Sequence, residues 1–269
     1  MRSMPRHMMP SQAEPEPLEV RLMNLASMGL LSVCVLIAVT AAVQWVAAHP
    51  LWTLRSVTVT GDVDHNNALT LRANVAPKLK GTFFTLDLAE ARQAFESVPW
   101  VRQAVVKREF PNRLHVVLSE YQPVALWGPE GASTLLDEHG TVFEANVGEV
   151  EQDHLPRLLG PDAQAAQVLA SYRALQPLFE QRSVSIETLE LTGRGSWQAT
   201  LDTGARIELG RGDVAEVQAR ADRFMRTLPQ VTSKYGRRLG ALEYADLRHE
   251  AGYAIRLQGV TTVANTKPL

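Results

Sequence analysis

The hydrophobic pattern of the chain begins with one long apolar run and continues with shorter, alternating segments. No Asp, Glu, Lys or Arg occurs between Arg21 and Arg55. A helix over residues 22–46 would be about 38 Å long at 1.5 Å per residue, which exceeds the roughly 30 Å hydrocarbon core of a bilayer. The run therefore predicts a transmembrane helix over residues 22–46, preceded by a short tail over residues 1–21.

Two other interpretations of this run remain open, a cleaved signal peptide and a buried core helix. Residues 46–48 weakly resemble a signal-peptide cleavage site, but the run is longer than the apolar stretch of about 7–15 residues that such signals contain. Three arginines precede the run, whereas Arg55 is the only Lys or Arg between it and Arg72. The positive-inside rule then predicts a cytoplasmic N-terminus and export of residues 47–269.

The next region, residues 52–121, has the pattern of a small domain with alternating strands and amphipathic helices. Asp87 is a suitable N-cap, Pro99 ends the helix that follows it, and Trp100 is expected to be a buried packing residue. The order is strand, helix, helix, strand, strand, which predicts an α+β domain with both helices on one face of a three-stranded sheet. The predicted elements are strand 52–60, helix 69–76, helix 87–98, strand 101–110 and strand 114–120.

The second region, residues 124–258, is rich in strands and contains two flanking helices. Gly140 supplies the positive φ that a hairpin turn needs, and Asp213 is an N-cap for a helix that stops near Pro229. Residues 259–269 are expected to form a loose tail. The predicted elements are hairpin 135–143, helix 161–181, strands 184–191, 197–201 and 205–209, helix 214–227, and strands 239–248 and 253–258.

Composition and charge exclude several classes of function. The 269 residues are 45% hydrophobic and 21% charged, with a net charge of -2, so no strong basic field indicates a nucleic-acid partner. The single cysteine, Cys34, excludes a disulfide and thiolate-rich metal sites. Ser133, Asp137 and His139 resemble a catalytic triad only in residue type, because they fall within one predicted hairpin. We expect no catalytic residues, cofactor, metal or small-molecule substrate, and a periplasmic enzyme stays a remote alternative.

The two regions together resemble a known family. The stretch GTFFTLDLAEARQAFESVPWVRQAVVKREFPNRLHVVLSEYQPVALW, residues 81–127, is similar to the POTRA domain of the FtsQ/DivIB cell-division family. The closest parts are residues 98–101, 110–114 and 120–125. In the second region the resemblance continues over residues 197–204, 209–213 and 245–255. A single POTRA domain directly after one membrane anchor is more specific than either feature alone.

This resemblance implies a non-catalytic, bitopic scaffold of the divisome, in the inner membrane at the division septum. The implied partners are FtsB, FtsL and other divisome proteins, and the scaffold would link cytoplasmic and periplasmic division proteins. The alternative is another POTRA-bearing envelope protein that assembles or secretes outer-membrane proteins. That class needs repeated POTRA units or a long C-terminal barrel, for which the second region is too short.

The resemblance also implies a binding site, at which FtsB adds a strand to the edge of the last strands. The matching residues are Arg248, His249, Glu250, Ala251, Gly252 and Tyr253. The family often has an aromatic residue where His249 stands and a small residue where Tyr253 stands, so the side-chain contacts differ here. Arg194 matches a position that contacts an acidic partner helix. The alternatives are a simple turn at residues 250–252 and an ordinary loop arginine.

Overall fold

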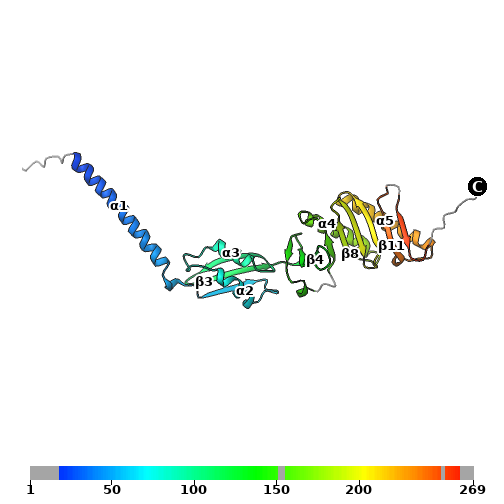
Figure 1. The fold of residues 1–269 in the computed structure, drawn as a ribbon, viewed down its shortest axis with the longest axis horizontal. Helices are drawn as coiled ribbons and strands as arrows, with labels where there is room; N and C mark the ends of the chain where they lie inside the picture. Colours follow the sequence, from blue (N-terminus) through cyan, green and yellow to red (C-terminus); the bar gives the residue numbers. More distant parts are fainter. Residues whose placement is uncertain (1–17, 151–154, 250–251, 261–269) are drawn as a thin grey trace, which may run out of the picture.

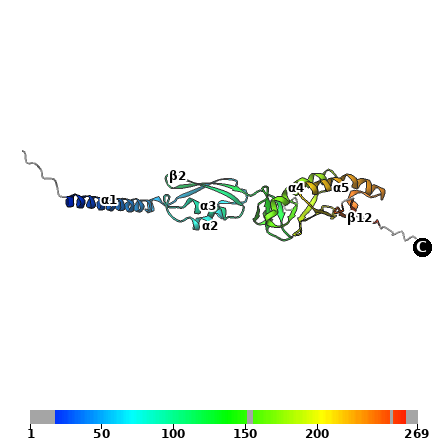
Figure 2. The same cartoon turned by 90° about the horizontal axis from the view of Figure 1, so that it is seen from above.

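The computed structural model describes residues 18–150, 155–249 and 252–260 of the chain. Its three parts follow one another along an elongated molecule, with a long helix, a small mixed domain and a larger β-rich domain in that order (Figures 1 and 2). The helix and the last strands therefore lie at opposite ends of the protein.

The long helix, α1, spans Leu18–Ala47 and carries the apolar run. Its 18-residue apolar window is not buried against any other part of the described chain, so the interpretation as a buried core helix is wrong. At 1.5 Å per residue its 30 residues extend about 45 Å, and its composition suits a membrane interior. The prediction of an apolar helix that fits a transmembrane helix is confirmed.

The small domain has the predicted order of elements, with helices on one face of a three-stranded sheet (Figure 1). In that sheet β3 is central, parallel to β1 and antiparallel to β2. The first strand begins four residues later than expected, because a short 3-10 helix, η1 (Pro50–Trp52), connects α1 to it. The elements are β1 Ser56–Gly61, α2 Ala68–Val75, α3 Leu88–Glu96, β2 Val101–Glu109 and β3 Arg113–Glu120.

Local sequence signals explain how this domain forms. The Asp87 carboxylate accepts a hydrogen bond from the backbone N–H of Ala89 at 2.7 Å, which satisfies a free donor of the first turn of α3. Alternation along β3 directs Val116 and Leu118 onto the helices, where they pack with Phe95 in one buried cluster. The α+β fold predicted for this region is confirmed.

The larger domain is built on a nine-stranded mixed sheet in the order β12-β11-β10-β9-β8-β7-β4-β5-β6. Two of its strands, β4 and the three-residue β7, were not predicted. The segment that forms β7 has too few residues to show an alternating pattern. In the structure, β7 lies between β4 and β8 and so joins the two halves of the sheet. The strands are β4 Pro123–Trp127, β5 Thr134–Asp137, β6 Val142–Glu144, β7 Arg157–Leu159, β8 Ile186–Leu191, β9 Ser196–Leu201, β10 Arg206–Arg211, β11 Leu242–Asp246 and β12 Ala254–Leu257.

Two helices, α4 (Ala165–Glu180) and α5 (Val214–Lys234), lie side by side on one face of this sheet (Figure 2). Trp197 from the sheet and Phe224 from α5 are each about 1% exposed in the same core cluster. The prediction that the second helix stops near Pro229 is wrong, because α5 continues for another turn. Buried Leu228 and Thr232, on either side of the proline, hold that turn against the core.

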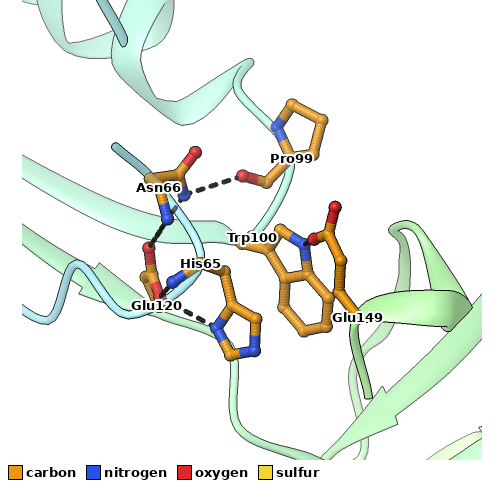
Figure 3. Close-up of polar contacts among 6 residues, drawn as sticks. All are labelled: His65, Asn66, Pro99, Trp100, Glu120 and Glu149. Carbon is orange, nitrogen blue, oxygen red and sulfur yellow. Dashed lines mark hydrogen bonds and ion pairs between the residues drawn. The ribbon is translucent and has the colours of Figure 1, made fainter. Parts of the chain in front are cut away.

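The junction between the two domains is built around Trp100 (Figure 3). Trp100 is 3% exposed, so the expected packing role is confirmed, but it packs with Leu126 and Phe143 of the larger domain and not in the helix-covered core of its own domain. Its indole N–H donates to the Glu149 carboxylate at 2.8 Å, and its ring stacks on His65 with centroids 3.9 Å apart. Trp100 thus joins the domains.

The buried carboxylate of Glu120 stabilises the same junction through the loop that contains His65 and Asn66 (Figure 3). The Glu120 side chain is fully buried and accepts from the backbone N–H groups of His65 and Asn66, both at 3.0 Å. The Asn66 amide also donates to Glu120, at 2.9 Å, and to the carbonyl of Pro99, at 3.0 Å. Because buried polar groups are costly unless they are paired, these contacts fix the loop that carries His65 against Trp100.

Candidate protein-binding site

The last strand of the large sheet, β12, has a partner on only one side among the described residues. It pairs antiparallel with β11, with Asp246 opposite Ala254 and Ala245 opposite Ile255. Ala254 and Arg256 are exposed, and Leu257 alone is buried. An edge strand of this kind presents backbone N–H and C=O groups that another extended chain can pair with.

The segment expected to carry the binding contact lies next to this edge, but it is not itself a strand. Residues 247–249 and 252–253 connect β11 to β12 as a loop, because the ladder ends at the pair of Asp246 and Ala254. Arg248, His249 and Gly252 are exposed. The predicted strands 239–248 and 253–258 are therefore shorter than expected. Glu250 and Ala251 lie outside the described residues.

Arg248 is held in place by the last residue of β11. Its guanidinium makes two hydrogen bonds to the Asp246 carboxylate, at 2.9 and 2.6 Å, and its backbone N–H makes a third at 3.0 Å. These hydrogen bonds lower the pKa of Asp246 to about 2 and raise the pKa of Arg248. The side chain of Arg248 is still 55% exposed, so a fixed cation faces solvent beside the edge strand.

Tyr253, where the family often has a small residue, is attached to α5. Its hydroxyl lies 2.8 Å from the Thr227 hydroxyl, and its ring packs edge-on against Phe224 with centroids 4.9 Å apart. The tyrosine therefore packs against the middle of α5 immediately before β12 begins. The side chain of Tyr253 is therefore used by the fold itself, whereas the outer backbone edge of residues 254–257 has no strand partner among the residues that the structure describes.

A hollow of about 980 Å³ lies over β9 and β10, which β11 separates from β12. Four arginines and one glutamate line it, so its charge is positive and complementary to an acidic partner. Arg194 is exposed in the loop before β9 and makes no ion pair with any described residue, whereas Arg220 donates to the carbonyls of Leu209 and Arg211. The lining residues are Thr192, Gly193, Arg194, Ser196, Gln198, Glu208, Gly210, Arg211, Arg220 and Arg248.

The structure thus places two of the expected residues, Arg194 and Arg248, in the same hollow although they are far apart in the sequence. Sequence reasoning missed Arg211 and Arg220. Gly210 brings them together with Arg248, because a Cβ at this glycine would lie 2.9 Å from the Arg220 guanidinium and 3.2 Å from the Arg248 stem. A glycine in an otherwise alternating strand was the available signal, since it marks a close approach of other groups.

The residues that resemble a triad have structural roles. The Asp137 carboxylate accepts from the backbone N–H groups of His139 and Thr141, at 3.0 and 2.6 Å, and so closes the turn between β5 and β6. The His139 ring contacts Arg102 of β2 across the domain junction. No hydrogen bond joins Ser133 to either residue in the described part of the chain.

Both domains of the chain match families of known proteins. Residues 53–121 match the family model of the FtsQ-type POTRA domain, and residues 125–248 match that of the C-terminal region of cell division protein FtsQ/DivIB. The chain is 40% identical to cell division protein FtsQ of Thiomonas arsenitoxydans over 91% of its own length and 89% of the relative. It is 39% identical to FtsQ of Burkholderia pseudomallei, over 92% and 96% of the two chains. The chain belongs to the FtsQ/DivIB cell-division family.

Membership in the FtsQ/DivIB family supports a role in the divisome and partners among division proteins. It also decides between the two classes of POTRA-bearing protein considered from the sequence. Both domains match cell-division members, so an assembly factor for outer-membrane proteins is not supported.

Proposed function

We propose that this protein is a non-catalytic scaffold of the divisome, anchored in the inner membrane by α1. Its N-terminus lies in the cytoplasm, and its two domains lie in the periplasm at the division septum. It binds FtsB and FtsL and so links division proteins on the two sides of the membrane. The observation that carries this proposal is that β12 has only one neighbouring strand within the described part of the chain, close to a hollow lined by arginines.

The binding mode follows from the two parts of the site. An extended segment of FtsB pairs its backbone with Ala254–Leu257 and extends the sheet by one strand. An adjacent acidic segment of the partner lies over the hollow, where Arg194 and Arg248 meet its carboxylates. In this mode the paired strand begins at Ala254, directly after the segment from Arg248 to Tyr253 in which the family resemblance places the contact.

A pair of neighbouring proline substitutions tests strand addition. Successive N–H groups along a strand point to opposite sides, so either Ile255→Pro or Arg256→Pro removes an outward donor and the other disrupts pairing with β11. The variant that keeps the wild-type melting temperature should bind an FtsB peptide about 5- to 150-fold more weakly, since an unpaired backbone group costs roughly 1–3 kcal/mol. Alanine at the same two positions is the matched control, and titration of the full-length protein in nanodiscs is the measurement.

Two results would contradict the proposed contact. One is wild-type affinity in a proline variant that is shown to be folded. The other is an equal loss of affinity for proline and alanine at the outward position, because that would place the binding energy in the side chain and not in the backbone.

The membrane topology has a separate test. A reporter that is active only outside the cytoplasm should be active when fused after Leu269 and inactive when fused before Arg21. A processed chain that begins near residue 49 would show instead that the apolar run is a cleaved signal, and the anchor would have to be abandoned.

A further inference from the structure

Figure 1 shows that one end of the POTRA domain adjoins α1, and exposed apolar residues gather in a patch at this end. Leu51 is 75% exposed, Phe84 47% and Phe110 72%. These residues come from three separate segments, namely η1, the loop before α3, and the turn between β2 and β3. Large apolar side chains gathered at one tip of a domain indicate a surface that another apolar phase covers.

The aromatic rings of the patch form a continuous group. Phe83 is buried beneath it, with its ring centroid 5.1 Å from that of Phe84 and 6.4 Å from that of Phe110. Trp52 packs edge-on against Phe84 with centroids 4.9 Å apart. The exposed rings are therefore supported by a buried one and do not stand alone on flexible loops.

Hydrogen bonds attach this tip directly to the end of α1. The Thr82 hydroxyl donates to the carbonyl of Ala47, the last residue of the helix, at 2.7 Å. The backbone N–H of Phe83 donates to the carbonyl of Trp52 at 2.7 Å. The Arg108 guanidinium donates to the carbonyls of Phe83 and Leu86, at 2.7 and 2.6 Å, and fixes the loop from the other side.

The position of the helix end in the bilayer then sets the position of the patch. Trp45 is 69% exposed, two residues before the helix ends, and tryptophan is favoured at the membrane–water interface. Leu51 is only four residues beyond Ala47. The first surface that Leu51, Phe84 and Phe110 can meet is therefore the outer interface of the bilayer that α1 crosses.

The charges beside the patch suit lipid headgroups. Arg55, Arg108 and Arg113 are exposed at the same tip, and the backbone N–H of Arg55 donates to the carbonyl of Asn112 in the turn next to Phe110. Within the described residues, only Arg113 of the three pairs with a carboxylate, that of Glu109 at 3.4 Å. Apolar rings with neighbouring arginines match the acyl boundary and the phosphates of an interface.

We infer that Leu51, Phe84 and Phe110 rest in the outer interface of the membrane and seat the POTRA domain on it. The contact limits rotation of the domain about the end of α1 and gives the elongated molecule a fixed direction away from the bilayer. This inference rests on the membrane span of the proposed function. The occupant is the lipid of the bilayer itself, not a partner protein.

Spin labels on single cysteines test the contact in the full-length protein. The chain is reconstituted in liposomes of phosphatidylethanolamine and phosphatidylglycerol. In a Cys34→Ser background, Phe84→Cys and Phe110→Cys place one label each in the patch, while Val105→Cys places a label on an exposed apolar position of the same domain, 41% exposed, away from the tip. The native Cys34, exposed within α1, reports insertion of the helix.

We expect labels at positions 84 and 110 to be several-fold less accessible to a water-soluble nickel relaxant than the label at 105, and more accessible to oxygen. Equal accessibility at 84, 105 and 110, with a deep label at Cys34, would overturn the interfacial contact but leave the anchor standing. A water-exposed label at Cys34 would overturn both. Protection of positions 84 and 110 only after FtsB and FtsL are added would also overturn the inference, because the patch would then be a protein contact.

A second readout follows orientation. The double variant Phe84→Ser/Phe110→Ser should broaden the distribution of distances between a label at Thr203 of the larger domain and the bilayer surface, whereas Val105→Ser should leave it unchanged. Since Phe84 and Phe110 are exposed, the double variant should keep the wild-type melting temperature. An unchanged distribution in the folded double variant would contradict the proposed seating role.

Discussion

The junction at Trp100 and the edge at β12 each contain a hydrogen-bonded carboxylate, Glu120 and Asp246, but the two carboxylates serve opposite purposes. At the junction, Trp100 is 3% exposed and the Glu120 carboxylate has all its partners within the fold. At the edge, Arg194 is exposed and Arg248 extends from a carboxylate toward solvent. Polar groups at the junction stabilise the chain's own geometry, whereas the arginines near the edge are exposed, which suits the protein contact proposed there.

The carboxylates show this difference most clearly. Glu120 accepts from the backbone N–H groups of His65 and Asn66, so its carboxylate is paired within the fold without any second protein. Asp246 instead orients a guanidinium whose remaining donors point outward. A variant at the junction should therefore mainly change the stability of the fold, and a variant at the edge should mainly change the affinity for a partner.

The largest effect expected from this comparison belongs to Trp100→Ala. Removing a buried tryptophan typically costs about 3–5 kcal/mol, and the loss here also removes the hydrogen bond to Glu149 and the stack on His65. We expect a clear fall in melting temperature and faster proteolysis between the two domains. The affinity for an FtsB peptide, measured below the new melting temperature, should be unchanged.

Val105→Ala is the control for this variant, since Val105 is 41% exposed and its loss should change stability by less than about 0.5 kcal/mol. A Trp100→Ala protein that keeps its stability but loses FtsB binding would reverse the assignment of the two regions.

A smaller effect is expected from Arg194→Glu in the hollow. Reversing an exposed charge should weaken binding of an acidic partner by about threefold to tenfold, mainly through slower association, and the difference should shrink at high salt. Stability should not change, because Arg194 makes no ion pair with any described residue. Arg206→Glu, an exposed arginine on β10 outside the hollow, provides the control in a salt-dependent kinetic titration. Equal losses in both variants would indicate a general charge effect and not a localised site.

The smallest effect concerns acid stability at the edge. The hydrogen bonds from Arg248 lower the pKa of Asp246 to about 2, below its usual value of 3.8. A carboxylate with a lowered pKa in the folded state stabilises the fold above its unfolded pKa, and this contribution is lost as the pH falls through the folded value. The wild-type melting temperature should therefore fall slightly more between pH 4 and pH 2 than that of Asp246→Asn.

Other carboxylates titrate equally in both proteins, so the difference between the two acid curves isolates Asp246. Superimposable curves would show that the ion pair with Arg248 does not stabilise the fold, and that its role is confined to orienting the guanidinium.

The sequence predicted the first domain well because its signals are local. An N-cap at Asp87 and the alternating pattern of the strands are each readable within a few residues, and the order of elements followed from them. The continuation of α5 past Pro229 was not readable, because buried neighbours such as Thr232 outweigh the unfavourable proline.

The candidate site was harder to predict for a physical reason. Arg194, Arg220 and Arg248 line one hollow because β9, β10 and β11 are neighbours in the sheet and α5 packs beside β10, and no short-range pattern records this arrangement. The position of Trp100 between the domains could not be predicted either, because a sequence pattern indicates that a residue is buried but not which domain supplies its neighbours. Resemblance to the family suggested the region of the proposed site, and the structure adds that β12 has no second neighbouring strand among the described residues.

The separation of α1 and β12 at opposite ends of the molecule also sets a requirement of reach (Figure 1). A partner anchored in the same bilayer has to carry its pairing segment past the whole POTRA domain and across the larger sheet before the segment meets the last strand. A tether that is too short gives an effective concentration near zero at this edge, whatever the affinity of the isolated segment. Under the proposed binding mode, the length of the molecule sets a minimum length for the chain that connects a partner's membrane anchor to its pairing segment.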